Sequence, residues 1–286
     1  MAPRVSTYMS SPVVAVRPTD TLAYARNLML KKDIGRLVVI DEKEDLVGIV
    51  TVSDLVSAMY EVEFDRPLDQ IKVREVMSPN VITIESNKTL KAAAKLMIKN
   101  DVGGLPVLGR DGKVVGIITR SDVVRAFSER HGGEFKVKEV MRTDVATVKP
   151  THSLFYVIKQ MESDPSRKVL VVDDQGRLLG VVAERDVALL TLPRTLIEAR
   201  GKDRYMRRKA VDQLRGKLVT LRNYLIPLAE DVMTPDPVTA SPDDDLADVA
   251  RIMASERIGC VPVVDSGGKV VGIVSKGDIV QLMSRI

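Results

Sequence analysis

Short apolar runs and helical patterns alternate along the chain in an order that occurs four times. Each unit opens with a β-branched run, continues through a polar stretch into an amphipathic helical pattern, and then has two Val/Ile-rich runs joined by a turn. A second helical pattern follows. This order predicts four β-α-β-β-α units in a mixed α/β (α+β) fold. The opening runs are Val13–Val16, Val81–Ile84, Val145–Val148 and Val238–Ala240.

The units share one register, which is typical of copies of a single supersecondary element. In each unit a glycine lies 39 residues, and an aspartate 45 residues, after an opening methionine. The methionines are Met9, Met77, Met141 and Met233; the glycines are Gly48, Gly116, Gly180 and Gly272; the aspartates are Asp54, Asp122, Asp186 and Asp278.

Polar residues predict where helices begin and where strands turn. Tight turns are expected between the two later runs at Asp111-Gly112, Gln175-Gly176 and Gly267-Gly268. One unit of about 55 residues exposes an apolar sheet face and is marginal alone, so we expect units to pack in pairs. Candidates for the N-cap of the first helix in each unit are Thr19-Asp20, Asn87-Lys88, Thr151-His152 and Asp243-Asp244.

Spacing favours pairs of units that are consecutive in the chain. The opening methionines are 68, 64 and 92 residues apart, which places an insertion after the third unit. The linker lengths alone would also permit the second unit to pair with the third. The predicted domains are repeat one (1–60), repeat two (61–130), repeat three (131–190), a basic insertion (191–228) and repeat four (229–286), with modules at 1–130 and 131–286.

The segment from glycine to aspartate reads GIVTVSD, GIITRSD and GIVSKGD in three of the units. Its T/S-x-x-D ending is the pattern of a helix capping box, with Thr51, Thr119 or Ser275 as the N-cap. The same geometry suits a ligand, because free N–H groups at a helix N-terminus bind phosphate and an aspartate can accept hydrogen bonds from a ribose diol. The sequence alone leaves both interpretations open.

These residues resemble the cystathionine-β-synthase (CBS) domain family. The M-x(4)-V openings, the GLPV and CVPV runs and the G-h-x-[TS]-x-x-D endings carry the resemblance, which covers all four units. It implies two tandem Bateman modules, each of two repeats about a pseudo-twofold axis, with clefts that bind AMP, ADP, ATP or S-adenosylmethionine. Similar four-repeat chains include the γ subunit of AMP-activated protein kinase, and prokaryotic CBS-domain nucleotide sensors are similar too.

The resemblance also implies a role for each residue that matches the motif. The aspartates Asp54, Asp122, Asp186 and Asp278 would hold ribose hydroxyls. The hydroxyl residues Thr51, Thr119 and Ser275 would contact the phosphate. The apolar residues Val13, Val81, Leu105, Val238 and Val261 would sandwich the adenine, by backbone as much as by side chain.

The third unit departs from the motif, since it reads GVVAERD. Ala183 replaces the hydroxyl residue, and Glu184 stands where the second and fourth units carry Arg120 and Lys276. One interpretation is that Glu184 repels a phosphate, so that this site is weak, empty or adapted to a ligand with less phosphate. The other is that the helix has merely lost its cap, at a cost of about 1 kcal/mol.

Cations beside the motifs favour a phosphate-bearing ligand. Arg36 and Lys168 occupy equivalent positions, 27 residues after the opening methionine, where the other units have Gly104 and Cys260. Together with the cations of the T/S-x-x-D segments they favour AMP, ADP or ATP over the cationic sulfonium of S-adenosylmethionine. Each one, taken singly, is also compatible with an ordinary surface charge.

The insertion is strongly basic. Ten Lys or Arg and three acidic residues lie between Arg194 and Arg222, a local charge of +7 in a chain whose formal net charge is +4. Apolar residues from Val211 to Leu225 follow helical spacing, which predicts an amphipathic basic helix (194–224) ending before Pro227. It could pack on its own module, dock an acidic partner or bind nucleic acid, although the scarcity of aromatics disfavours the last.

Composition narrows the functional classes. One cysteine and two histidines argue against a disulfide, a zinc site and a His-dependent triad. No apolar run approaches the roughly 18 residues of a membrane span, and the N-terminus lacks a signal-peptide core. We therefore expect a cytoplasmic regulatory protein with no catalytic residues, no metal and no catalytic cofactor. It would act on a partner protein, with its modules forming a disk within one chain or in a homodimer.

Overall fold

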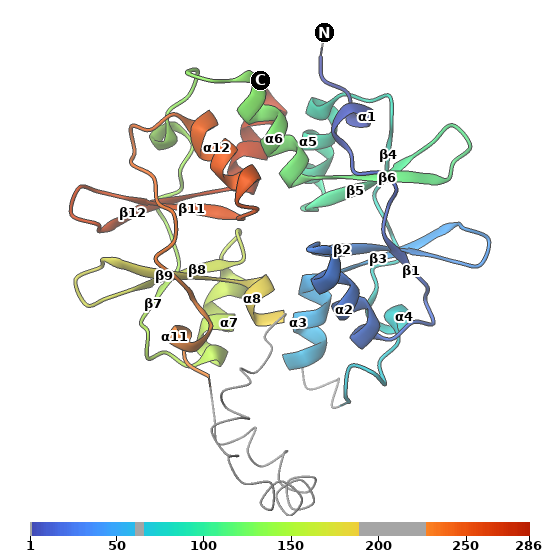
Figure 1. The fold of residues 1–286 in the computed structure, drawn as a ribbon, viewed down its shortest axis with the longest axis horizontal. Helices are drawn as coiled ribbons and strands as arrows, with labels where there is room; N and C mark the ends of the chain where they lie inside the picture. Colours follow the sequence, from blue (N-terminus) through green and yellow to red (C-terminus); the bar gives the residue numbers. More distant parts are fainter. Residues whose placement is uncertain (1, 61–65, 189–226) are drawn as a thin grey trace, which may run out of the picture.

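The computed structural model describes residues 2–60, 66–188 and 227–286. Its β-sheets lie across the middle of the molecule, and helices cover them above and below (Figure 1). Repeats one and two, here the first module, lie on the right of this view, and repeats three and four, the second module, lie on the left. The predicted basic helix (194–224) lies outside the described residues.

Each repeat has the predicted β-α-β-β-α order. In the first three, the opening strand pairs in parallel with the second, which pairs antiparallel with the third. In the fourth, the predicted opening run (Val238–Ala240) makes only one parallel bridge, from Ala240 to Val263, and the strand before it, Thr234–Pro235, pairs antiparallel with Leu178–Ala183 of repeat three. The elements are β1 (Ala15–Val16), α2 (Leu22–Lys32), β2 (Arg36–Ile40), β3 (Leu46–Thr51) and α3 (Val52–Tyr60); β4 (Ile84–Glu85), α5 (Leu90–Lys99), β5 (Gly104–Leu108), β6 (Val114–Thr119) and α6 (Arg120–Arg130); β7 (Thr147–Val148), α7 (Leu154–Ser163), β8 (Lys168–Val172), β9 (Leu178–Ala183) and α8 (Glu184–Ala188); β10 (Thr234–Pro235), α12 (Leu246–Ser255), β11 (Cys260–Val264), β12 (Val270–Ser275) and α13 (Lys276–Arg285).

The predicted turns are confirmed. Gly112, Gly176 and Gly268 adopt positive φ angles of 77°, 79° and 77° at the hairpins. Only glycine takes this conformation without a steric penalty from Cβ. In repeat one Glu44 fills the equivalent position at φ 62°.

The predicted N-caps of the first helices are wrong. Each helix begins at its leucine, so the cap is the residue directly before it. Asp20 and Asp244, which were among the predicted caps, instead accept hydrogen bonds from the backbone N–H groups of Arg17 and Ser241 in the preceding turn, at 2.7 and 2.8 Å. The observed caps, whose side-chain oxygens accept a backbone N–H two or three residues later, are Thr21, Thr89, Ser153 and Asp245.

A short helical turn before each opening methionine packs on the other repeat of its own module. Val5 of α1 (Val5–Tyr8) lies in the core around α5 and α6 of repeat two. Val73 of α4 (Val73–Val76) lies in the core around α2 and α3 of repeat one. The second module makes the same exchange with η2 (Val137–Glu139) and α11 (Ala229–Val232). The leading segments therefore cross between the two repeats of each module.

The two modules meet through their helices. One hydrophobic core joins repeats two and four, where α6 packs on α12 and α5 packs on α13. A second core joins repeats one and three, where α3 packs on α8. Two modules thus face each other within one chain.

Candidate functional site

The four glycine-to-aspartate segments end at the N-termini of α3, α6, α8 and α13, where a strand passes directly into a helix. In repeat two, Asp122 Oδ2 accepts hydrogen bonds from the backbone N–H of Thr119 at 2.8 Å and from its hydroxyl at 2.7 Å. Thr51 with Asp54, and Ser275 with Asp278, repeat this arrangement at 2.6–2.8 Å. The predicted capping box is therefore confirmed at α6 and α13, and at α3 the Asp54 carboxylate accepts the N–H of the predicted N-cap residue.

These cap bonds use one carboxylate oxygen of each aspartate, and in repeats two and four the other oxygen lies near an arginine. Asp122 Oδ1 lies 3.5 Å from Arg125 Nη2, and Asp278 Oδ1 lies 3.4 Å from Arg142 Nε. The capping role therefore leaves an oxygen that can accept a bond from a ligand hydroxyl.

Burial raises the pKa of Asp54, Asp122 and Asp186 above the usual aspartate value. The hydrogen bonds from Thr51 and Thr119 act in the opposite direction, because they favour the ionised form. These carboxylates thus lie in partly dry surroundings, where an added hydrogen bond is stronger than in water.

The third repeat keeps half of the capping arrangement. Asp186 Oδ2 accepts the backbone N–H of Ala183 at 2.8 Å, and the missing hydroxyl removes only the second bond. Glu184 turns toward the first module, where it accepts a hydrogen bond from Ser53 Oγ of α3 at 2.7 Å. Coulombic attraction from Arg185 and Lys168 acts to lower the pKa of Asp186, against its burial.

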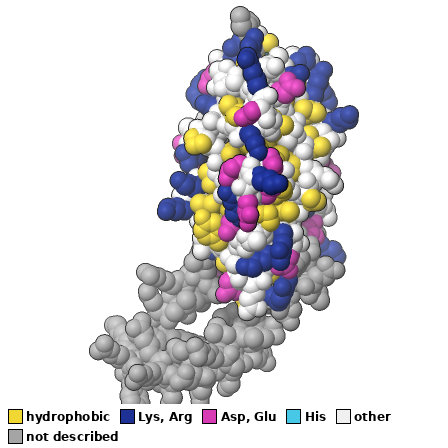
Figure 2. Space-filling model, turned by 90° about the vertical axis from the view of Figure 1, so that its right-hand side faces the viewer, with side chains coloured by type: hydrophobic (Ala, Val, Ile, Leu, Met, Phe, Trp, Pro, Cys, Tyr) yellow, Lys and Arg dark blue, Asp and Glu magenta, His cyan; other side chains and the backbone are white. Residues whose placement is uncertain are grey.

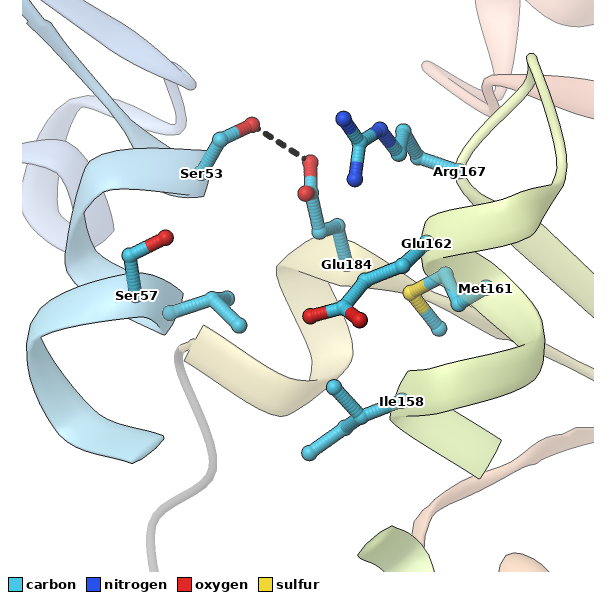
Figure 3. Close-up of a pocket in the computed structure, with 8 residues that line it drawn as sticks. Ser53, Ser57, Ile158, Met161, Glu162, Arg167 and Glu184 are labelled. Atoms are coloured by element: carbon cyan, nitrogen blue, oxygen red, sulfur yellow. Dashed lines mark hydrogen bonds between the residues drawn. The ribbon is translucent and has the colours of Figure 1, made fainter. Parts of the chain in front are cut away.

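Glu184 lines a small pocket of about 80 Å³ between the modules. Figure 3 shows Ser53 and Ser57 on one wall, and Ile158, Met161 and Glu162 of α7 on the other, with the guanidinium of Arg167 near Glu184. The Glu184 carboxylate is thus engaged in the contact between modules, which weakens the idea that it repels a phosphate bound at Asp186.

Arg36 projects from the start of β2 onto the second repeat. A methyl group built on Gly104 would lie 2.6 Å from Arg36 Nη1, and one on Gly103 would lie 2.6 Å from Nη2, so these glycines make room for the guanidinium. Burial lowers the pKa of Arg36 to about 10, and the nearby charge of Arg120 adds to the shift. Arg36 forms no hydrogen bond or ion pair with a residue of the described ranges.

Lys168 repeats this arrangement in the second module. A methyl group built on Gly259 would lie 2.9 Å from Lys168 Cε. The Lys168 ammonium donates to the backbone oxygen of Ser166 at 2.6 Å. Cys260 beside it is buried, which raises the pKa of its thiol and leaves it a poor nucleophile.

Lys276 and Arg120 connect the two modules at the N-termini of α13 and α6. Lys276 Nζ donates to Ser121 Oγ of repeat two at 2.8 Å. In the opposite direction, Arg120 Nη1 approaches within 3.8 Å of a methyl group built on Gly277. Burial lowers the pKa of Lys276 to about 8, and Lys168 contributes the next largest effect.

The predicted adenine-contact residues differ in exposure. Val13 and Val81 are partly buried and Val238 is 43% exposed, all three in segments at or near the opening strands. Leu105 and Val261 are fully or almost fully buried in the core that joins repeats two and four. Their side chains already have packing partners, so only their backbone is available to a ligand.

Sequence reasoning missed the contacts that depend on tertiary arrangement. Ser53 and Ser121 occupy variable positions of the motif, and nothing in the sequence indicates that they reach the other module. Asp33 at the C-cap of α2 binds Arg185 of repeat three and, at 2.6 Å, Arg257 of repeat four. This ionic contact lowers the pKa of Asp33.

In the described ranges, no group of three or more His, Cys, Asp or Glu side chains could hold a metal ion. None of the helices described is both long enough and apolar enough to cross a bilayer.

Comparison with known proteins agrees with these arrangements. The model of the CBS domain matches residues 5–61, 73–129, 137–191 and 229–285. The uncharacterized protein MJ1225 of Methanocaldococcus jannaschii is 27% identical over 282 residues, which is 94% of either chain. Its crystal structure, presented as that of a candidate archaeal homologue of γ-AMPK, has a TM-score of 0.79 and covers 98% of this chain and 99% of that one.

A conserved uncharacterized protein of Pyrococcus horikoshii shares the fold, with a TM-score of 0.65 at 23% identity, over 98% of this chain and 99% of that one. Because the family model covers most of the sequence in four copies, the identity of the fold does not depend on any single relative. The chain belongs to the CBS-domain family.

Proposed function

We propose that this protein is a regulatory sensor of AMP, ADP or ATP that acts on a partner protein in the cytoplasm and has no catalytic activity of its own. The observation that carries the proposal is the gathering of Arg36, Arg120 and Lys276 around the N-terminus of α6, next to Asp122. An aspartate for the ribose diol and cations for the phosphate stand side by side.

The predicted binding residues take three roles in this proposal. The four motif aspartates would hold ribose hydroxyls, and the backbone N–H groups at the helix N-termini would receive phosphate. The caps Thr51, Thr119 and Ser275 donate to their own aspartate, so their hydroxyls would contact phosphate only after switching partners. The adenine would lie against Val13, Val81 or Val238 and the backbone of Leu105 or Val261.

Likeness to MJ1225, the candidate archaeal homologue of γ-AMPK, supports an adenine-nucleotide ligand. S-adenosylmethionine is the second candidate within the family, but its sulfonium would meet the cations of this cluster and be repelled. In the mechanism we propose, a nucleotide shifts the relative position of repeats by binding one arrangement more tightly, and a partner reads the change. A second copy of the chain is not needed to bring two modules face to face.

Nucleic-acid binding is less well supported. The case for it comes from the basic helix predicted at residues 194–224, which lies outside the described ranges. On the edge of the first module, acidic and basic side chains are interspersed (Figure 2), for example Lys113 and Asp45 at 2.6 Å. Such a surface does not offer the single-sign field that attracts a polyanion.

The test is a thermal-shift panel with AMP, ADP, ATP, S-adenosylmethionine and GMP on the wild type and on Asp122→Ala with Asp278→Ala. Ligand at 100 times its Kd stabilises by about 2.7 kcal/mol per site, a shift of a few degrees. Asp244→Ala is the matched control, because it also removes a carboxylate that accepts a backbone N–H. The proposal is supported if adenylates raise the unfolding temperature of the wild type and of Asp244→Ala but not that of the double variant. It is refuted if no adenylate raises the unfolding temperature of the wild type.

A further inference from the structure

Repeat three carries an arginine directly after its opening methionine, where the other repeats have a serine or a threonine. The residues at this position are Ser10, Ser78, Arg142 and Thr234. The backbone of Arg142 exchanges hydrogen bonds with Ile273 of β12, at 2.9 Å in both directions. Ser10 makes the same exchange with Ile117 of β6, at 2.9 and 3.0 Å. The difference between the repeats at this position therefore lies in the side chain.

The Arg142 guanidinium lies between carboxylates of two different repeats. Its Nη2 donates to Asp164 Oδ1 at 3.2 Å, and its Nε lies 3.4 Å from Asp278 Oδ1. The side chains of Asp164 and Asp278 are only 4% and 11% exposed. Ion pairs with carboxylates buried to this extent are screened little by water and salt, so they hold the guanidinium in place.

Asp164, the C-cap residue of α7, anchors this guanidinium. Burial acts to raise the pKa of Asp164, but hydrogen bonds from Ser166 and Arg142 outweigh it and hold that pKa below the usual aspartate value. Asp164 is therefore a charged partner for Arg142. The other repeats have no such pair at this place, because the residue after their opening methionine is uncharged.

Asp278 thus has a partner for each of its two carboxylate oxygens. Oδ2 accepts hydrogen bonds from the N–H and the hydroxyl of Ser275, at 2.7 and 2.6 Å. Oδ1 faces Arg142. A ribose hydroxyl that approaches Oδ1 therefore meets an oxygen that a cation from repeat three already engages.

The competition at Asp122 is weaker. The cation beside its Oδ1 is Arg125, which lies on the same helix at 3.5 Å and whose side chain is 47% exposed. Arg125 also donates to the backbone oxygen of Tyr8 at 2.9 Å. Water screens the attraction of so exposed a guanidinium to Asp122, whereas Arg142 is held by the buried Asp164.

We propose that Arg142 is an internal competitor for the Asp278 carboxylate, so that repeat four binds a ribose only after this guanidinium has moved away. The inference rests on the proposed function, in which the motif aspartates hold ribose hydroxyls, and it ranks two of those sites. A site that is open for about one tenth of the time binds about tenfold more weakly. The Asp122 site should therefore fill at low nucleotide concentration and the Asp278 site at higher concentration.

Removing Arg142 tests this competition through the sign of the effect. If Arg142 attracted the ligand, its loss would weaken the binding of an anionic nucleotide. If it competes with the ribose, its loss frees a carboxylate oxygen and strengthens binding. Adenosine has no phosphate and should show this gain undiminished. The gain should be smaller for 2′-deoxyadenosine, which lacks one of the two ribose hydroxyls.

The experiment is titration calorimetry of the full chain with AMP, adenosine and 2′-deoxyadenosine. We expect AMP to bind the wild type in two affinity classes. Arg142→Ser should strengthen the binding of adenosine to the weaker class by about fivefold or more. Adding Asp278→Asn should abolish this gain. The amide oxygen still accepts the cap N–H, but the NH₂ group cannot accept a ribose hydroxyl.

Two further variants separate binding from stability. Arg142→Ser leaves Asp164 buried without its arginine, which destabilises the fold. Adding Asp164→Asn removes that charge and gives repeat three the residues that repeat two has, Ser78 and Asn100. This double variant should keep the gain in affinity and unfold at a higher temperature than Arg142→Ser. Arg177→Ser is the matched control, because it removes an exposed arginine that pairs with an aspartate of repeat three at 2.7 Å, and it should leave the affinities unchanged.

Binding to the wild type with no gain, or with a loss, in both Arg142 variants would overturn the competition and leave nucleotide sensing intact. A gain that survives Asp278→Asn would also overturn it, because the freed site would then lie elsewhere. Binding that appears only in the Arg142 variants would support the competition and overturn sensing by the wild type. If no probe binds the wild type or any variant, both proposals fail.

Discussion

Met77 Sδ of repeat two lies against Gly48 of repeat one, where a methyl group built on the glycine would come within 2.6 Å of the sulfur. Met233 and Gly180 make the same contact in the second module, also at 2.6 Å. The glycine and the methionine that share one register along the sequence thus meet across the two repeats of a module. The absence of a side chain at Gly48 lets the partner's leading segment pack on β3.

Gly48→Ala should therefore destabilise the chain by about 1–3 kcal/mol, the usual cost of overpacking. Urea unfolding measures this, and Gly132→Ala is the control because nothing lies within 4 Å of its added methyl group. Adding Met77→Ala to Gly48→Ala should recover part of the loss, since a flexible side chain is the nearest obstacle.

The same rescue should fail at Gly116. There the nearest atom to an added methyl group is the backbone oxygen of Ser10 at 2.7 Å, and the sulfur of Met9 is farther, at 3.0 Å. Met9→Ala would leave the backbone obstacle in place, so Gly116→Ala should stay destabilised. Equal rescue at both glycines would contradict this account of the Met–Gly contact.

The third repeat offers a gain-of-stability test. Ala183→Ser should add a hydroxyl bond to Asp186 Oδ2, as Ser275 makes to Asp278 at 2.6 Å. We expect a gain of about 0.5–1 kcal/mol in the free energy of unfolding, and a comparable or larger loss for Ser275→Ala as its counterpart. A destabilised Ala183→Ser would show that the local backbone does not permit the capping geometry of the other repeats.

The sequence predicted the features that depend on local pattern. The constant spacing of Met9, Gly48 and Asp54 and of their counterparts predicted the four repeats. The glycines between the later apolar runs predicted the hairpin turns. The N-caps were placed too early because Asp20 and Asp244 are good turn residues as well as good cap residues, and the sequence does not separate the two roles. The order of strands and helices within a repeat needed no tertiary information.

Contacts between repeats could not be predicted in this way. The turn at Val73–Val76 is too short to give a periodic signal, and its exchange between repeats follows from how the sheets meet. For the same reason, the spacing of residues in the sequence does not predict that Arg142 approaches Asp278 or that Lys276 contacts Ser121. The candidate aspartates and cations could be named, but which cations share one site could not.

Acid titration should distinguish two aspartates with opposite shifts. Burial raises the pKa of Asp122, so its contribution to stability is fully present below its unfolded pKa and is lost as the pH rises through the folded pKa. Bonds from Arg257 and Arg185 lower the pKa of Asp33, so its contribution is present above the unfolded pKa and is lost as the pH falls through the folded pKa.

Carboxyl NMR titration measures both groups, with Asp122→Asn and Asp33→Asn to assign the signals. The Asp122 midpoint should lie above the reference value of 3.8, and the Asp33 midpoint below it. Nucleotide affinity should then fall at a higher pH than an ordinary aspartate would dictate, because only the ionised Asp122 accepts two ribose hydroxyls. A midpoint for Asp122 at or below 3.8 would contradict its burial.

Separating the modules should expose the faces that join them. Ala93, Ala94 and Phe127 of α5 and α6 are fully buried in a core shared with Ala247 and Ala250 of α12. The four alanines let the helices approach closely, and all five buried side chains are apolar, so the faces that meet are apolar. Without the second module, residues 1–130 expose this surface to water.

We therefore expect residues 1–130, expressed alone, to dimerise through these helices, with light scattering after size exclusion as the measurement. Ala94→Glu, which introduces a charge into the apolar core of repeat two, should weaken the dimer, and Lys113→Glu on the distant hairpin should not. Circular dichroism checks that both variants fold. A monomeric, folded 1–130 at high micromolar concentration would show that the shared core contributes little to holding the modules together, because an exposed apolar face of that size should otherwise find a partner.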